Sequence, residues 1–409
     1  MINNNIKWIA AIVGAGIVAA LLIVWLVLLS GPSAAPVETA TTPSFGTGNT
    51  QTSVTNDQRQ TTNDQIQILQ TNTNQKIFKV TDGPVAGATL LITTRPTTTV
   101  ARFVLATNGH IMDVALDTPG AVAKAVSNTT IPGIVSALWS EGGQGALLQY
   151  LDAGALKTAH LALPAPAATS SRAVRVQFLP IGAANIAVSP DGASIAYLIK
   201  TAAGSDGYTA KADGTGSKKL FSLPFSQLLL SWPAQNTLLA QTSPAAGVPG
   251  AVFSINAKTG DTTPILYASG VTAIADRLFS KVVYQTADSS RNTYVRDTKT
   301  GLSKALSFDP IPEQCVWSNV SSTLLYCAAP LMAVPANYLD IWHTGEAAAS
   351  DGILTFDLNA GRSQIAAAPG GEDGGEESNI AELALSPDDR YLLFIRKGDR
   401  SLWGVRLND

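Results

Sequence analysis

The chain has 409 residues with a net charge of -3, and 14% of its residues are charged. The 27 basic residues and a pI of about 5.7 do not supply the basic face that binding to nucleic acid requires, so that class of protein is excluded. Three histidines and two cysteines leave few ligands for a zinc or iron–sulfur centre, so we expect neither a metal nor a cofactor.

The first feature in chain order is an uncharged stretch from Trp8 to Leu29. At about 1.5 Å per residue, a helix of this length spans the ~30 Å hydrocarbon core of a bilayer. Trp8 and Trp25 lie near its ends, at the level that interfacial aromatic residues prefer. A cleaved signal peptide is the alternative, although its apolar region is usually only about 7–15 residues long. We predict an uncleaved transmembrane helix at 8–29.

The flanking charges predict the orientation of this helix. Lys7 precedes it, whereas the first basic residue on its other side is Arg59. The positive-inside rule therefore predicts a cytoplasmic segment 1–7 and a single-pass protein of the cell membrane whose remainder is extracytoplasmic. Residues 30–74 are rich in Thr, Asn, Gln, Ser, Pro and Gly, and this composition predicts a disordered linker.

From residue 75 onward, short apolar runs alternate with polar turns. Several runs end in a turn glycine, at Gly214, Gly260, Gly301 and Gly361. The first two intervals between these glycines are about 41–46 residues long. The last interval, from Gly301 to Gly361, is about 20 residues longer than the others. A period in the low forties with several strands per repeat is typical of β-propeller blades.

Two of the turns share a motif, Ser189-Pro190-Asp191-Gly192 and Ser386-Pro387-Asp388-Asp389. Proline presets φ for such a turn, aspartate bonds backbone amides, and glycine accepts a positive φ. The motif resembles the WD40-like (PD40) β-propeller repeat of the periplasmic TolB type, in which the S-P-D-G turn joins the first two strands of a blade. The arrangement as a whole resembles uncharacterised bacterial propellers with a single membrane anchor.

We therefore predict an all-β protein in which residues 75–409 form a seven-bladed β-propeller, with six or eight blades as alternatives. The predicted first strands lie near 86–94, 134–140, 184–189, 227–232, 271–275, 313–319 and 380–386. The last blade lacks a fourth strand at its C-terminal end, whereas 75–81 is a strand without a blade. Because an open propeller exposes strand edges, we predict that 75–81 is the outer strand of the last blade.

The two cysteines fall in the first two strands of the predicted sixth blade. If Asn319 pairs with Thr323 across the turn, Cys315 lies directly opposite Cys327. Opposed residues have Cβ atoms about 4.5–5.5 Å apart, close to the distance that a disulfide needs. We predict a disulfide in an oxidising compartment, with two buried free thiols as the alternative.

The sequence contains no G-x-S-x-G, H-E-x-x-H or P-loop motif, and nothing in it brings its histidines together. His110 and His160 fall at or in third strands of the first two blades, and His343 lies in an insertion. We predict no catalytic residues, although a Ser-His-Asp set could assemble from different blades.

Two segments are candidate interaction sites. The insertion, about Ala328 to Ser350, connects the second and third strands of the sixth blade and is rich in residues that binding surfaces use. An acidic, glycine-rich loop, Pro369 to Ser378, follows the same blade, and propeller topology places both segments on one face. The insertion either binds a partner or folds down as a cap, and the loop either binds a cation or basic partner or is simply solvated. The candidate residues are Met332, Tyr338, Asp340, Trp342 and His343 in the insertion and Glu372, Asp373, Glu376 and Glu377 in the loop.

We expect a non-catalytic protein-interaction module of the cell envelope with an envelope protein as its partner. A glycan- or cell-wall-binding module using Trp342 and Tyr338 is one alternative. An enzyme with a carboxylate site at the propeller channel is another, because propellers host all three functions.

Overall fold

The computed structural model describes residues 75–94, 96–163, 174–307, 309–347 and 350–407. In these ranges there is no helix with the length and apolar character needed to cross a membrane. The segments predicted as a cytoplasmic N-terminus (1–7), a transmembrane helix (8–29) and a linker (30–74) lie outside the described residues.

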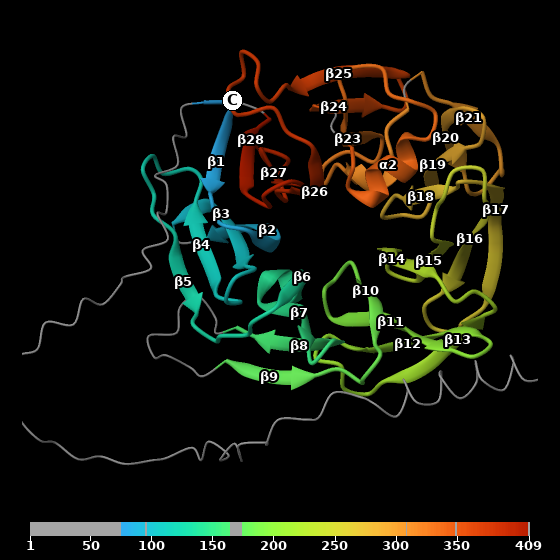
Figure 1. Cartoon of the computed structure of the whole chain (residues 1–409), viewed down its shortest axis with the longest axis horizontal. Helices are drawn as coiled ribbons and strands as arrows, with labels where there is room; N and C mark the ends of the chain where they lie inside the picture. The colour runs from blue at the N-terminus through green and yellow to red at the C-terminus, as the bar shows by residue number, and fades with distance from the viewer. Residues whose placement is uncertain (1–74, 95, 164–173, 308, 348–349, 408–409) are drawn as a thin grey trace, which may run out of the picture. The chain divides into compact units, whose positions relative to one another are not determined.

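Seven four-stranded antiparallel sheets form the blades of a β-propeller (Figure 1). The first strand of each blade is innermost, and successive strands follow outward. The first four blades contain β2 (Val85–Thr94), β3 (Thr97–Leu105), β4 (Ile111–Ala115) and β5 (Lys124–Ser127); β6 (Ile134–Ser140), β7 (Gly145–Asp152), β8 (Ala155–Ala162) and β9 (Arg175–Phe178); β10 (Ala184–Val188), β11 (Ser194–Thr201), β12 (Gly204–Lys211) and β13 (Lys218–Leu223); and β14 (Leu228–Ala234), β15 (Thr237–Thr242), β16 (Pro249–Asn256) and β17 (Thr262–Ser269).

The remaining three blades follow the same order except at the last strand. They contain β18 (Thr272–Ala275), β19 (Lys281–Ala287), β20 (Arg291–Asp297) and β21 (Ser303–Ala305); β22 (Cys315–Trp317), β23 (Leu324–Pro330), β24 (Asp351–Asp357) and β25 (Arg362–Ala367); and β26 (Ile380–Leu385), β27 (Tyr391–Arg396), β28 (Leu402–Arg406) and β1 (Ile77–Thr81). Two short 3-10 turns, η1 (Glu141–Gly143) and η2 (Pro312–Gln314), and the helix α2 (Tyr338–Thr344) complete the described elements. The predicted seven blades and their first strands are confirmed.

Strand β1 closes the ring, as predicted, by pairing with β28 as the outer strand of the seventh blade. Successive side chains of β1 pack toward two different blades. Ile77 packs into the hydrophobic cluster shared with the sixth blade, and Phe78 packs into the cluster shared with the first blade. Phe78 lies over its cross-strand partner Gly404, where a Cβ atom would stand 2.5 Å from the ring. A glycine is therefore required at position 404.

The buried hydrophobic residues gather between blades instead of at one centre. Seven clusters of described residues lie at the seven interfaces between neighbouring blades. Continuous apolar runs such as Ile195–Leu198 are buried because a blade is covered on both faces. This packing makes each blade depend on its two neighbours and makes closure of the ring a condition for the stability of the first and last blades.

The S-P-D-G turn joins β10 and β11, as the resemblance implies. The Ser189 hydroxyl donates to the Asp191 carboxylate (2.6 Å) and accepts from the Ser194 amide (2.9 Å). Gly192 has a φ of 73°, the left-handed conformation that glycine adopts without strain. The equivalent turn between β26 and β27 has the same pattern with Asp389 at a φ of 57°.

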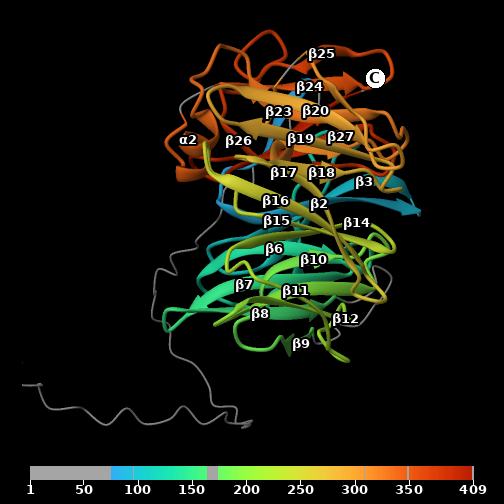
Figure 2. The same ribbon diagram turned by 90° about the vertical axis from the view of Figure 1, so that its right-hand side faces the viewer.

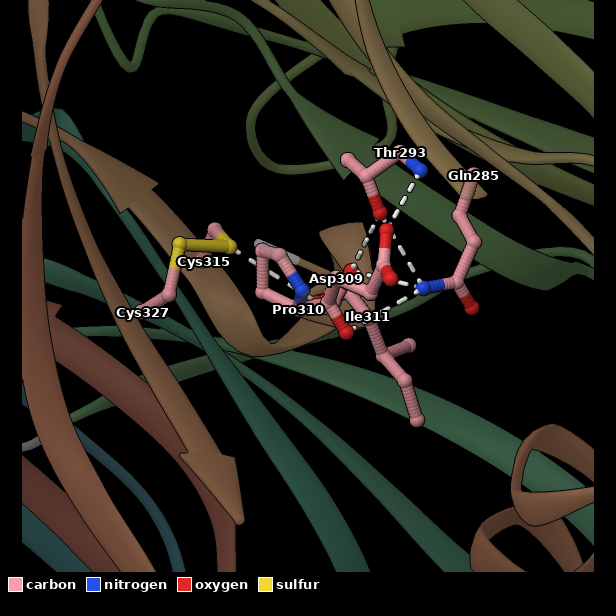
Figure 3. The surroundings of a disulfide bond; sticks show 7 residues. All are labelled: Gln285, Thr293, Asp309, Pro310, Ile311, Cys315 and Cys327. Atoms are coloured by element: carbon pink, nitrogen blue, oxygen red, sulfur yellow. Dashed lines mark hydrogen bonds between the residues drawn. A yellow bond between two sulfur atoms is a disulfide. The ribbon is translucent and has the colours of Figure 1, made fainter. Parts of the chain in front are cut away.

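Cys315 of β22 and Cys327 of β23 are directly paired in the register and form the predicted disulfide. Figure 3 shows the bond next to the segment 309–311, which connects the fifth and sixth blades. Two polar groups of the fifth blade hold this segment: the Gln285 side chain donates to the Pro310 carbonyl (3.0 Å), and the Thr293 amide donates to the Asp309 carboxylate (2.8 Å).

We expect Phe78→Ala to destabilise the propeller by about 3–5 kcal/mol, because it opens a cavity in the cluster that joins the last blade to the first. Denaturant unfolding measures the effect. Leu302→Ala, which truncates a side chain that is 72% exposed, is the control and should change stability by less than about 0.5 kcal/mol. Equal stability of the two variants would contradict the role of β1 in closure.

Removing the disulfide by Cys315→Ser together with Cys327→Ser should cost about 3 kcal/mol, the loop-closure value for a sequence separation of 12. Thermal unfolding with and without reductant measures it, and the double variant should no longer respond to reductant. Mass spectrometry that detects two alkylatable thiols in the untreated, unfolded protein would refute the bond.

Candidate binding faces

Because the strands of each blade are antiparallel, successive connections alternate between the two faces of the propeller. First-to-second-strand turns lie on one face, and second-to-third connections lie on the other. The predicted insertion is the connection from β23 to β24 in the sixth blade, and it contains the helix α2. Figure 2 shows α2 on one face of the propeller.

One side of α2 is buried against the fifth blade. Tyr338 is 2% exposed and Leu339 is fully buried, and both pack with Ala287 and Ile311. The Arg291 guanidinium lies 5.3 Å from the centre of the Tyr338 ring, a cation–π contact. The helix of the insertion is therefore folded down onto the fifth blade.

Polar contacts fasten the insertion to two further blades. The Asp340 carboxylate accepts the Ala246 amide of the fourth blade at 2.8 Å. In the seventh blade, the Lys397 ammonium donates to the Trp342 carbonyl and lies 4.1 Å from the centre of its ring. The insertion also contacts its own sixth blade and the fifth blade, so its contacts span four consecutive blades. We call residues 331–347 the cap platform.

The outer side of the cap platform carries exposed apolar side chains. Met332 is 80% exposed and Leu331 is 40% exposed, at the start of the insertion. His343 is also exposed, and its imidazole lies 3.7 Å from the Glu313 carboxylate. Of the five candidates in the insertion, Met332 is free of blade contacts within the described ranges, and His343 is exposed but reaches Glu313. Tyr338, Asp340 and Trp342 hold the platform to the blades.

The acidic loop lies against the closing strand. Asp373 pairs with Lys76 (3.4 Å), and its carbonyl accepts the Ile77 amide (3.1 Å). Glu376 lies 3.8 Å from Lys79 and also pairs with Arg396. The other two candidate acids, Glu372 and Glu377, are exposed. Within the described ranges, no group of three or more His, Cys, Asp or Glu side chains could hold a metal ion.

A carboxyl group is buried beneath the cap platform. Asp351 is fully buried; one of its oxygens accepts the Ile380 amide (2.8 Å), and the other has no hydrogen-bond partner. Burial raises the pKa of Asp351 to about 7, although the hydrogen bond from the Ile380 amide and the nearby Lys397 ammonium oppose the shift. Burial also lowers the pKa of Lys397, which already bonds Trp342, and raises that of Tyr338.

The opposite face opens into the central channel, where a cavity of about 800 Å³ lies. First-strand residues form its wall and first-to-second-strand turns form its rim, which we call the channel mouth. Arg277 and Asp191 are the residues with ionisable side chains among the described lining. No sequence motif marks this site, although the tryptophans in three first strands (Trp139, Trp232 and Trp317) are a signal for it.

The structure pairs one serine with one histidine, both in the second blade. The Ser140 hydroxyl and His160 Nε2 are 3.4 Å apart, and the two residues are 1% and 2% exposed. Burial lowers the pKa of His160, which keeps the imidazole neutral at pH 7. As predicted, His160 lies in a third strand, and His110 directly precedes one. Because both groups are buried, substrate has no access to this pair in the described conformation.

These features define a seven-bladed β-propeller with a capped face and an open channel mouth. No protein-family model matches the chain, and no curated protein matches it in sequence. Several solved structures share the fold. They include an oligogalacturonate lyase in complex with manganese, with a TM-score of 0.57 at 12% identity over 82% of this chain and 94% of that chain.

A chain of the mitotic checkpoint complex has a TM-score of 0.51 at 12% identity, over 83% of this chain and 96% of that chain. TolB from Acinetobacter baumannii, whose repeat type the S-P-D-G turns resemble, has a TM-score of 0.43 at 11% identity over 71% of this chain and 63% of that chain. At such identities, the likenesses with TM-scores above 0.5 show the fold alone.

We expect the closed cap platform to lose stability as the pH rises from about 4 to 7. The pKa of Asp351 is about 7 in the folded protein and 3.8 in an opened state, so the closed form holds a proton that the opened form releases. The loss amounts to at most about 4 kcal/mol. Hydrogen exchange of residues 338–347 at pH 4.5 and 7.5 measures it.

Asp351→Asn should remove most of this pH dependence, because an amide does not ionise. Glu346→Gln, which removes an exposed carboxyl from the same connection, is the matched control and should keep it. Exchange rates in the Asn variant that change with pH as in the wild type, after correction for intrinsic exchange, would contradict the assignment to Asp351.

Proposed function

We propose that this chain is a single-pass membrane protein whose extracytoplasmic β-propeller serves as a protein-interaction module of the cell envelope. Residues 8–29 are its anchor in this proposal, and the cap platform is its contact surface. The observation that carries the proposal is the construction of this platform. It is fixed to four blades on its inner side and presents the exposed Met332 and Leu331 on its outer side.

The rigidity of the platform supports binding. A surface that is already ordered loses little conformational freedom when a partner docks. Methionine is a common contact residue at adaptable binding surfaces because its side chain is flexible and polarizable. His343 and the exposed Glu346 give the platform a polar rim.

The alternatives from the sequence analysis have less support. Glycan binding through Tyr338 and Trp342 would require the helix to move, because the Tyr338 ring is buried and the Trp342 ring lies against Lys397. The likeness to the lyase at 12% identity concerns the fold, and one fold hosts many unrelated activities.

Proximity labelling in the native cell, with the label fused after Asp409, tests the proposed surface. We expect Met332→Asp to remove a reproducible set of envelope proteins, because a charge in an apolar contact weakens binding by about tenfold or more. Leu302→Asp, at a residue that is 72% exposed in a connection on the opposite face, is the matched control and should retain the set. Identical sets for both variants would contradict the assignment of the surface.

A separate measurement tests the anchor. Deleting residues 2–30 should release the protein from the membrane fraction, and protease added outside intact cells or spheroplasts should digest the propeller of the wild type. A wild-type protein that is soluble, or that is protected until the membrane is lysed, would contradict the proposed topology without affecting the platform.

A further inference from the structure

Three of the first-to-second-strand turns share a hydrogen-bonded pattern that makes them comparable position by position. In the third, fifth and seventh blades, the amide of the first turn residue donates to the carbonyl five residues later, at 2.9, 3.0 and 2.8 Å. The three turns are 189–194, 276–281 and 386–391. Asp276, Arg277, Leu278 and Phe279 therefore correspond to the Ser-Pro-Asp-Gly of the third blade.

The second position of these turns lies at the channel mouth. Pro190, Arg277 and Pro387 all line the cavity of about 800 Å³. The fifth blade thus presents a guanidinium group where the other two turns present a proline ring.

The fifth-blade turn accommodates this change in two ways. Its capping carboxylate is at the first position, where Asp276 accepts the amides of Ser280 (2.6 Å) and Lys281 (2.8 Å). Its fourth residue is Phe279 with a φ of 52°, which is unusual for a bulky side chain. The fourth position of the other two turns also has a positive φ, at Gly192 and Asp389, so Phe279 preserves the geometry of the turn.

The guanidinium is held in place but is not neutralised. Arg277 donates to the Asn319 side-chain oxygen, and Asn319 is itself fixed because its amide group donates to the Ser386 carbonyl (2.8 Å). Among the described residues, no carboxylate forms an ion pair with Arg277. The remaining N–H groups of Arg277 are available as donors.

The neighbouring carboxylates are already occupied. Asp191 accepts from Ser189 (2.6 Å) and Gln235 (2.8 Å), and Asp389 accepts the Asn319 amide (2.9 Å) and the Ser318 hydroxyl. The hydrogen bonds lower the pKa of Asp191, with that from Ser189 as the largest cause, so this lining carboxylate stays charged. Among the described residues it forms no ion pair with Arg277, and the guanidinium remains available to an anion.

The wall behind Arg277 carries several apolar side chains. A second cavity of about 420 Å³ shares Arg277 with the first, and Trp232, Trp317 and Leu383 are among its lining residues. We propose that the channel mouth binds a carboxylate carried on an apolar body, with Arg277 as its anchor. The C-terminus of an apolar peptide and a free small acid both have this chemistry.

The same contacts argue against a sugar acid as the ligand. A sugar ring needs a hydrogen-bond partner for each hydroxyl that it buries. Two polar side chains at the mouth, Asn319 and Asp191, are already bonded within the propeller. An apolar body requires no such partners.

The test uses the full chain in nanodiscs and the pentapeptide Leu-Leu-Phe-Leu-Leu, once with a free C-terminal carboxylate and once as the amide. We expect the wild type to bind the acid at least about tenfold more tightly than the amide, as charge-assisted hydrogen bonds predict. Titration calorimetry measures both affinities. Arg277→Gln should abolish the preference, and Arg277→Lys should retain part of it because the charge remains.

Arg362→Gln, at an exposed arginine on the outer strand β25, is the matched control and should retain the full preference. Competition by octanoate would identify a free acid as a sufficient ligand, whereas its failure to compete would favour the peptide. Equal binding of acid and amide, no binding of either, or a preference that survives in Arg277→Gln would overturn the proposal. So would binding of trigalacturonate in place of both peptides.

Discussion

The structure depends on the pairing of β1 with β28. Every blade of this propeller buries its apolar residues against its neighbours, so an unclosed ring would expose a full blade face at each end as well as unpaired strand edges. A strand from the beginning of the described chain removes both liabilities at once. Ile77 and Phe78 contribute to the packing on either side of the seventh blade, and the acidic loop adds a backbone hydrogen bond and ion pairs along the outer edge of β1.

Much of this architecture can be predicted from the sequence because the information is local and repeated. Apolar runs that recur with a period in the low forties locate the first strands, and the short turn between Asn319 and Thr323 sets the register that opposes Cys315 to Cys327. The acidic loop is a case in which inference from the local sequence fails. Its composition suggests a solvated or cation-binding segment, whereas its actual partners, Lys76 and Lys79, are about 300 residues away in the chain and are brought to it only by closure of the ring.

The candidate sites were less predictable than the fold. Aromatic residues in the insertion mark it as unusual, but their placement depends on contacts with three other blades, which no local pattern encodes. The channel mouth was missed because Asp276-Arg277-Leu278-Phe279 shares no residue with the S-P-D-G motif at matched positions. Only the hydrogen bonds of the folded chain show that the two turns are equivalent.

Closure by β1 also has a kinetic consequence. The partner strand β28 follows β1 by roughly 320 residues, so the pairing is among the most non-local contacts in the chain and carries a high loop-closure cost. During synthesis, β1 emerges first and has no partner until the seventh blade is complete. Its apolar residues are exposed throughout that interval, so the nascent chain is open to misassociation and to capture by chaperones until the ring forms.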